Sequence, residues 1–131
     1  MILTLHMGNA FGKSYKLCSK IQISRLFSNG KQVKSTDFNL IFLKDEFNIE
    51  KSFQVMISVS KKKYKKAVQR NLIKRVCREA IRENKLILES YLLGNGKKVL
   101  FIVNYKGPIS PIQEELNPQI KSLFEKLIKN V

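Results

Sequence analysis

The sequence predicts an α+β fold, a two-layer α/β sandwich in which helices pack on a mixed sheet. An alternating strand (53–60), a long amphipathic helix (68–85) and an apolar strand (98–105) follow one another, which is the order of a strand–helix–strand unit. The chain has 131 residues, 44% of them hydrophobic, and no linker rich in Gly, Ser or Pro. We therefore expect one domain, residues 1–131, with residues 1–10 as a flexible N-terminal tail.

The first part of the chain is predicted to hold a short helix and an alternating strand. Ser19 can cap the helix, and Asn29-Gly30 is expected to end it in a left-handed conformation. Its apolar residues are Ile23, Leu26 and Phe27. In the stretch 37–43, successive side chains point to opposite faces of a sheet. One face takes Phe38, Leu40 and Phe42, and the other takes Asn39, Ile41 and Leu43.

The second part holds the strand–helix–strand unit and a final helix. The first strand presents Phe53, Val55, Ile57 and Val59 on one face. The strand at 98–105 is apolar nearly throughout, which predicts a central strand covered on both faces. Asn117 is expected to cap the final helix, with Pro118 at its first position. The core stripe of this helix is Ile120, Leu123, Phe124, Leu127 and Ile128.

Positive charge is concentrated in residues 61–85. The chain has a net charge of +15, and this stretch holds eleven Lys or Arg against two acids, Glu79 and Glu83. On a helical wheel one broad arc is apolar, and we expect it to dock on the sheet. That arc holds Val68, Leu72, Ile73, Val76, Cys77, Ala80 and Ile81. The remaining arc is almost purely cationic and holds Arg70, Asn71, Lys74, Arg75, Arg78, Arg82 and Lys85.

A cationic helix face of this kind indicates a polyanionic partner. Like charges repel at helical spacing, and a phosphate backbone relieves that repulsion because Arg binds phosphate in a bidentate way. A solvated Lys-rich surface would leave the clustering unexplained, and a membrane-bound helix would need the apolar arc that the core uses. Tyr64, in the loop before the helix, is expected either to stack on a base or to lie in a flexible solvated loop.

Residues 58–82, SVSKKKYKKAVQRNLIKRVCREAIR, resemble the bacterial ribonuclease P protein subunit. The matching positions are Ser58-Val59-Ser60-Lys61-Lys62, Ala67-Val68, Arg70-Asn71, Ile73-Lys74-Arg75 and Arg78-Glu79. Upstream, FGKSYKL (11–17) resembles the opening motif of the family, so the likeness covers roughly residues 11–130. The chain departs from the family pattern where Leu72 replaces an Arg, where Lys63-Tyr64-Lys65-Lys66 replaces a Gly-containing loop, and at Lys16 and Ile23.

The resemblance implies a four-stranded mixed sheet with about three helices in the order αβββαβα. It also implies a left-handed strand–helix–strand crossover, although such crossovers are usually right-handed. In this family the protein does not cut RNA. It binds the catalytic RNA of ribonuclease P and helps to remove the 5′ leader of precursor tRNA. We expect Mg²⁺ to be held largely by that RNA, with no cofactor or metal bound by the protein alone, and a monomer in the absence of RNA.

The resemblance also assigns roles to residues, none of them catalytic. Contacts with the catalytic RNA are expected at Arg70, Asn71, Lys74, Arg75, Arg78 and Arg82. A cleft between the first helix and the sheet is expected to receive the single-stranded leader. Its candidate residues are Phe27, Lys61, Lys62, Lys63, Phe11, Lys13, Tyr15 and Ile41. For Phe27, packing in the core is an equal alternative.

Two other classes of protein remain as alternatives. The first is a structural RNA-binding protein of the ribosomal type, with no catalytic role. The second is a DNA binder that places the basic helix in a major groove, which requires the helix to project from its scaffold. The acids Asp45, Glu46 and Glu50 lie in a hydrophilic loop, which is typical of solvated acids and not of a metal pair. Two isolated cysteines and the lack of a signal or membrane segment lead us to expect a cytoplasmic protein with no membrane partner.

Overall fold

The computed structural model describes residues 15–44 and 51–131, and their elements follow the predicted order αβββαβα. The candidates Phe11 and Lys13, the expected tail and the three loop acids lie outside these residues. The elements are α2 (Lys20–Asn29), β1 (Lys31–Lys34), β2 (Phe38–Lys44), β3 (Phe53–Val59), α3 (Ala67–Gly94), β4 (Val99–Tyr105) and α4 (Gln113–Lys129).

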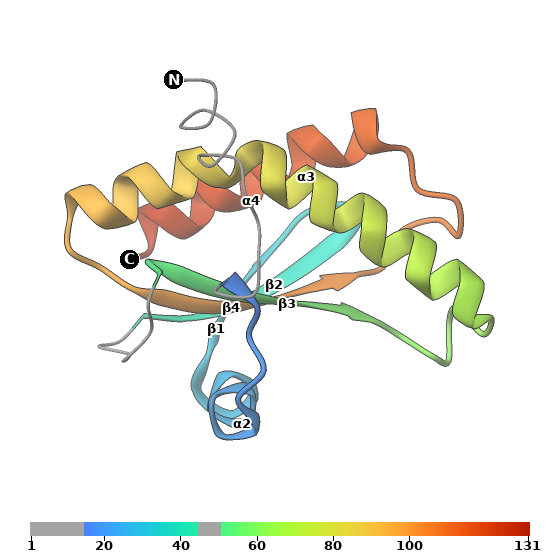
Figure 1. Cartoon of the computed structure of the whole chain (residues 1–131), viewed down its shortest axis with the longest axis horizontal. Coiled ribbons are helices and arrows are strands. Elements are labelled where there is room, and N and C mark those ends of the chain that lie inside the picture. The colour runs from blue at the N-terminus through green and yellow to red at the C-terminus, as the bar shows by residue number, and fades with distance from the viewer. Residues whose placement is uncertain (1–14, 45–50) are drawn as a thin grey trace.

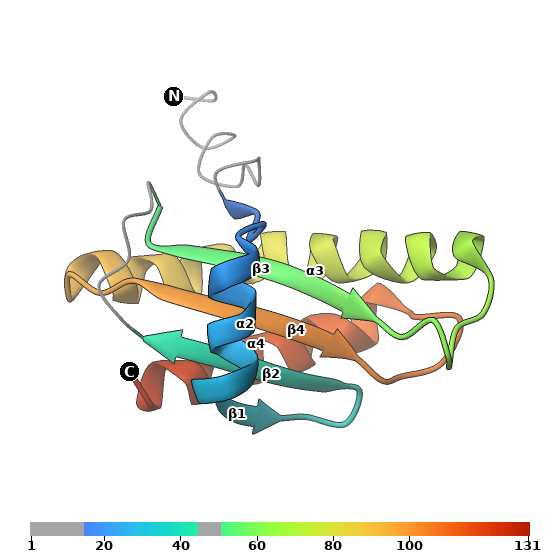
Figure 2. The ribbon, with the colours of Figure 1, turned by 90° about the horizontal axis from the view of Figure 1, so that it is seen from below.

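The four strands form one mixed sheet in the order β1-β2-β4-β3. β1 and β4 each pair antiparallel with β2, and β3 pairs parallel with β4. The apolar strand β4 is therefore central, as predicted. In Figure 2, β3 and β4 both point to the right, β4 lies below β3, and α3 lies behind them. This arrangement is a left-handed crossover, as the resemblance to the family implied. Strand–helix–strand crossovers in general are usually right-handed.

Helices cover both faces of the sheet. α3 and α4 lie side by side on one face, and α2 crosses the other (Figures 1 and 2). The alternation predicted in β2 is confirmed, because successive residues belong to different cores. Phe38, Leu40 and Phe42 pack in the large core under α3 and α4. Ile41 packs with Leu26 of α2 in the smaller core on the opposite face.

The end of α2 differs from the prediction. Ser19 caps its start, accepting a hydrogen bond from the backbone of Gln22, but Gly30 is extended (φ −71°, ψ 151°) and not left-handed. Glycine is needed here for space. A Cβ atom on Gly30 would lie 2.4 Å from the carbonyl oxygen of Leu26 and 2.5 Å from Cγ2 of Ile41. The turn into β1 is therefore packed directly against the helix and the sheet.

The start of α4 also differs. The helix begins at Gln113, so Asn117 is not its cap and Pro118 lies inside the helix. The added first turn buries Leu116 and places Glu114 and Glu115 at the positive end of the helix dipole. Asn117 instead donates a hydrogen bond of 2.6 Å to the carboxylate of Glu83 on α3. It joins the two helices, a role that a pattern within one helix does not reveal.

Candidate nucleic-acid interface

The N-terminal part of α3 extends beyond α4. α4 begins beside Glu83, where Gln113 and Asn117 both donate to the carboxylate, and the earlier turns of α3 project past it (Figure 1). In those turns only the side facing the sheet is buried, so Val68 is 79% and Leu72 41% exposed. The prediction that both residues dock was wrong, because the flank that α4 covers further along is open here.

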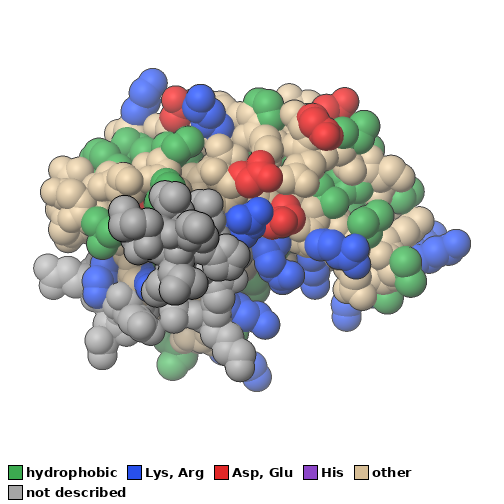
Figure 3. Space-filling model, turned by 45° about the horizontal axis from the view of Figure 1, so that its top comes forward, with side chains coloured by type: hydrophobic (Ala, Val, Ile, Leu, Met, Phe, Trp, Pro, Cys, Tyr) green, Lys and Arg blue, Asp and Glu red, His purple; other side chains and the backbone are tan. Residues whose placement is uncertain are grey.

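Within the described residues, part of the cationic face of α3 has no internal partners. This part consists of Asn71, Lys74, Arg75 and Arg78. None of them forms a hydrogen bond or ion pair with a side chain or backbone group in residues 15–44 and 51–131. Figure 3 shows a band of Lys and Arg side chains on this side of the molecule, below a group of Asp and Glu side chains. Three cations without internal partners on one helix face are well suited to contact phosphates.

Two further predicted contacts, Arg70 and Arg82, have internal partners. Arg82 Nε lies 2.7 Å from Glu79 Oε2, and this hydrogen bond lowers the pKa of the Glu79 carboxyl. Arg70 Nη1 donates to the carbonyl oxygens of Tyr64 and Lys65, at 2.8 and 2.9 Å. Because Lys66 provides no side-chain cap, Arg70 is the side chain that ties the preceding loop to the start of α3.

Lys85 does not belong to the cationic face, contrary to the prediction. Its side chain is only 1% exposed, and its Nζ lies 3.1 Å from the hydroxyl of Tyr15 and 3.9 Å from Glu89. Burial is the main cause that lowers the pKa of Lys85. The Tyr15 hydroxyl donates to Glu89, so the segment before α2 is fastened to α3 by a buried polar cluster.

Tyr64 is not exposed for stacking on a base, and it does not lie in a solvated loop, so neither expectation for it is met. Its side chain is fully buried, its hydroxyl donates to the carbonyl of Gly107, and its ring lies 5.8 Å from that of Tyr105. Lys63 adds a second connection by donating from Nζ to the carbonyl of Lys106. These contacts fix the loop after β3, so that Lys61 and Lys62 are held exposed at the end of that strand.

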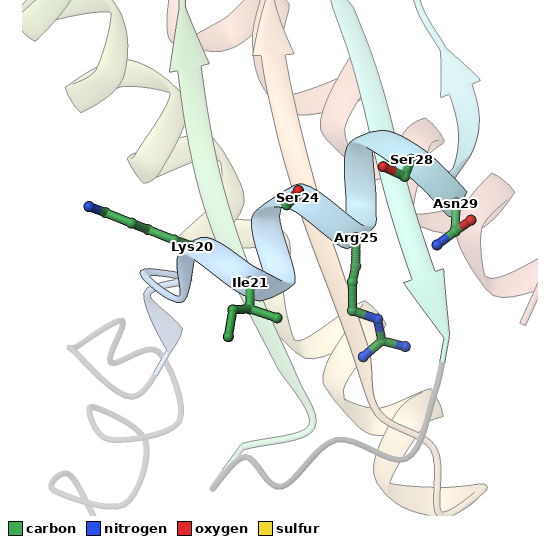
Figure 4. A pocket seen from close by; sticks show the side chains of 6 residues that line it. All are labelled: Lys20, Ile21, Ser24, Arg25, Ser28 and Asn29. Carbon is green, nitrogen blue, oxygen red and sulfur yellow. The ribbon is translucent and has the colours of Figure 1, made fainter.

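The described leader candidates do not form one site. Tyr15 is buried on the α3 side of the sheet, with its ring 5.0 Å from that of Phe53, whereas Ile41 is buried on the α2 side. Phe27 is 62% exposed on α2, so it is not a core residue. It follows Arg25 by two residues, about 200° around the helix. Figure 4 shows Arg25 pointing toward the beginnings of β3 and β4, so Phe27 lies on the flank toward their ends.

A hollow of about 390 Å³ lies along the outer side of α2 (Figure 4). Its lining comes from one helix and includes none of the leader candidates. The lining residues are Lys20, Ile21, Ser24, Arg25, Ser28 and Asn29. Over the described part of the chain, no group of three or more His, Cys, Asp or Glu side chains is placed to hold a metal ion. No helix in that part is long and apolar enough to cross a membrane.

Comparison with known proteins agrees with this architecture. The family model described as Ribonuclease P matches residues 11–130. The ribonuclease P protein component of Chlorobaculum tepidum is 30% identical over 132 residues, which cover 93% of this chain and 85% of the relative. That of Pseudoalteromonas translucida is 31% identical over 117 residues, covering 89% and 76%.

Solved structures show the same fold. The Staphylococcus aureus RNase P protein matches with a TM-score of 0.61 at 26% identity, covering 89% of this chain and 94% of the other. The Thermotoga maritima RNase P protein matches with a TM-score of 0.60 at 22% identity, covering 88% and 96%. The chain therefore belongs to the ribonuclease P family, as the RNA-binding protein component of the ribonucleoprotein enzyme that matures the 5′ end of tRNA.

Proposed function

We propose that the protein binds two RNA segments with two different surfaces. The cationic face of α3 contacts the catalytic RNA, and the α2 side of the sheet receives the single-stranded 5′ leader of precursor tRNA. The observation that carries the first assignment is the absence of internal partners for Lys74, Arg75 and Arg78 within the described residues. Arg82 can join that surface only by giving up its ion pair with Glu79.

The loop from Ser60 to Lys66 lies between the two surfaces, because it connects the end of β3 to the start of α3. Tyr64 and Arg70 anchor this loop to the body of the protein. Lys61 and Lys62 are exposed next to the end of β3, where their charge can attract the leader backbone. Phe27, on the neighbouring flank of α2, offers an exposed ring on which a base can stack.

In this proposal the residues of the chain bind and orient RNA and carry out no bond cleavage. The chemistry comes from the RNA, with Mg²⁺ held largely by that RNA. We further propose that the protein is a monomer before it binds RNA and works in the cytoplasm. The support for the role of the RNA is the resemblance of residues 58–82 to the family motif, and the support for the cytoplasm is the presence of two isolated cysteines.

The test is reconstitution with a bacterial ribonuclease P RNA at low, near-physiological Mg²⁺, following release of the leader from a precursor tRNA. We expect cleavage to require both protein and RNA. The double variant Arg75→Ala/Arg78→Ala should need more protein for the same cleavage. The matched control, Lys121→Ala/Lys129→Ala, removes two exposed charges from α4 and should behave as wild type.

Two results would contradict the proposal. If the protein binds the RNA tightly but never stimulates leader release, it acts as a structural RNA-binding protein. If the α4 variant loses as much stimulation as the α3 variant, total charge matters and the face of α3 is not the binding surface.

A further inference from the structure

The loop from Ser60 to Lys66 is held in place by a single buried side chain. Five of its seven residues are Lys, and charges of one sign this close repel one another, which favours an open, extended loop. The loop instead forms a turn, in which the backbone N–H of Tyr64 donates to the carbonyl of Ser60 at 3.0 Å. Tyr64 is the only buried residue from Ser60 to Lys66, so the packing that fixes the turn comes from Tyr64.

The side chain of Tyr64 reaches the loop between β4 and α4. Its ring lies beside that of Tyr105, with 5.8 Å between the ring centroids, and its hydroxyl donates to the carbonyl of Gly107. Burial is the main cause that raises the pKa of Tyr64, so the hydroxyl keeps the proton that it donates. Lys63 makes a second connection to the same loop, from Nζ to the carbonyl of Lys106.

The acceptor of the Tyr64 hydrogen bond is itself held by the body of the protein. The backbone N–H of Lys106 donates to the carbonyl of Asp37 at 2.7 Å. A Cβ atom on Gly107 would lie 2.6 Å from the hydroxyl oxygen of Tyr105 and 2.8 Å from Cγ of Asp37, so the body packs closely around this glycine. Gly107 is therefore a fixed point, and Tyr64 ties the lysine-rich loop to it.

On its other side the loop is tied to α3. Arg70 Nη1 donates to the carbonyl oxygens of Tyr64 and Lys65, at 2.8 and 2.9 Å. The contacts thus run from Gly107 through Tyr64 to Arg70, and they join the body, the loop and the start of the helix. Two groups of cations depend on these contacts for their relative position. The loop cations are Lys61 and Lys62, and the helix cations are Lys74, Arg75 and Arg78.

We propose that Tyr64 is a positioning residue that fixes the place of the loop cations relative to the helix cations. This inference rests on the function proposed above, in which the loop cations attract the precursor-tRNA leader and the helix cations contact the catalytic RNA. Groups that are held in place before binding lose less conformational entropy when the RNA arrives. Tyr64 acts on the precursor through Lys61 and Lys62, because its own side chain is fully buried.

The test is Tyr64→Phe in the reconstituted holoenzyme, because phenylalanine keeps the buried ring and loses only the hydrogen bond to Gly107. For a precursor tRNA with a full leader, we expect KM to rise about two- to ten-fold, the range of one hydrogen bond between neutral groups, with kcat unchanged. A precursor whose leader is cut down to its last nucleotide should show no change. The affinity of the protein for the catalytic RNA, and its dependence on salt, should also stay as in the wild type.

Tyr91→Phe is the matched control. The hydroxyl of Tyr91 also donates to a backbone carbonyl, that of Val131, but in the C-terminal part of α3, away from the loop. This variant should leave KM unchanged for both precursors. The double variant Lys61→Ala/Lys62→Ala provides a second comparison. Because Tyr64 acts through these two lysines, adding Tyr64→Phe to the double variant should raise KM no further.

Each outcome separates the inference from the function on which it rests. A Tyr64→Phe holoenzyme with the wild-type KM for the full leader refutes the positioning role and leaves the proposed function intact. Equal losses for both precursors, or a further loss in the Lys61→Ala/Lys62→Ala background, refute it as well, because Tyr64 then acts through general stability. A wild-type protein that stimulates no cleavage of any precursor refutes the proposed function, and the inference with it.

Discussion

The ion pair between Arg82 and Glu79 gives the sharpest prediction for RNA binding. Glu79→Gln removes the acceptor charge at 2.7 Å from Arg82 while keeping the length and helix propensity of the side chain. Both side chains are more than a third exposed, Glu79 at 43% and Arg82 at 35%. A pair this exposed contributes between about 0 and 1 kcal/mol, so the free energy of unfolding should change little.

The effect on binding to the ribonuclease P RNA should be larger. With Glu79 neutral, Arg82 adds one phosphate contact to those of Lys74, Arg75 and Arg78. One contact changes the slope of log affinity against log salt by about 0.9 on duplex RNA or about 0.7 on a single strand, taking the values for DNA. Between about 50 and about 200 mM salt, affinity should therefore fall by about three-fold more than in the wild type.

Equilibrium binding over a salt series measures this slope. Glu125→Gln is the control, because it makes the same change in net charge at an exposed position of α4 that has no ion pair within the described residues. Arg82→Ala should lose less slope than Arg75→Ala, since Arg82 must leave Glu79 before it can bind. Equal slopes for Glu79→Gln and Glu125→Gln would refute the reasoning.

Three further predictions concern stability and the departures from the family pattern. Leu72→Arg should change the free energy of unfolding by no more than about 0.5 kcal/mol, because Leu72 is exposed. The added charge should steepen the salt dependence of RNA binding. A clear loss of stability would identify Leu72 as a core residue. Gly30→Ala should destabilise by about 1–3 kcal/mol in urea unfolding, because of the close contacts around its missing Cβ, whereas Gly94→Ala, with nothing within 4 Å, should not; equal effects would contradict this account. Burial raises the pKa of Cys77 from 9.0 to about 12, so above pH 9 the unfolded thiol ionises while the folded one stays neutral, and stability should fall by up to about 4 kcal/mol as the pH rises to 12. That alkaline loss should be smaller in Cys77→Ala and unchanged in Cys18→Ala, as measured by urea unfolding at each pH.

The strands of the fold could be predicted from the local pattern of apolar residues along the sequence. Alternation in β2 assigned Phe38 and Ile41 to opposite faces, and continuous apolarity identified β4 as the central strand. The handedness of the crossover could not be obtained in this way. General stereochemistry favours the opposite hand, and only the likeness of the motif to a known family gave the right one.

The candidate site was predicted less well where burial depends on distant residues. A helical wheel orders the side chains of α3 but does not show that α4 begins only beside Glu83, so Val68 and Leu72 were assigned to the core. Lys85 is buried because Tyr15, seventy residues earlier, covers it. Tyr64 is surrounded by lysines in the sequence. Its contact with Gly107, which follows β4 in the chain, is visible only in three dimensions.

Polar side chains that the sheet brings into line show the same limit in a different form. Asn39, Ser58 and Asn104 are isolated polar residues in three separate strands, and nothing in the sequence connects them. Their alignment follows from the register of the sheet, which fixes paired positions across β2, β4 and β3. A shift of one residue in any strand would place its polar side chain on the other face.

The central position of β4 has a consequence for synthesis on the ribosome. β2 and β3 have no pairing with each other and are joined only through β4, which is the last of the described strands to be made. Until residues 99–105 emerge, the nascent chain carries the β1–β2 pair, the separate strand β3 and the basic helix α3, with no strand to join them into one sheet. Folding must therefore wait for the C-terminal third, and the pairing that completes it joins residues far apart in sequence, which makes it slow.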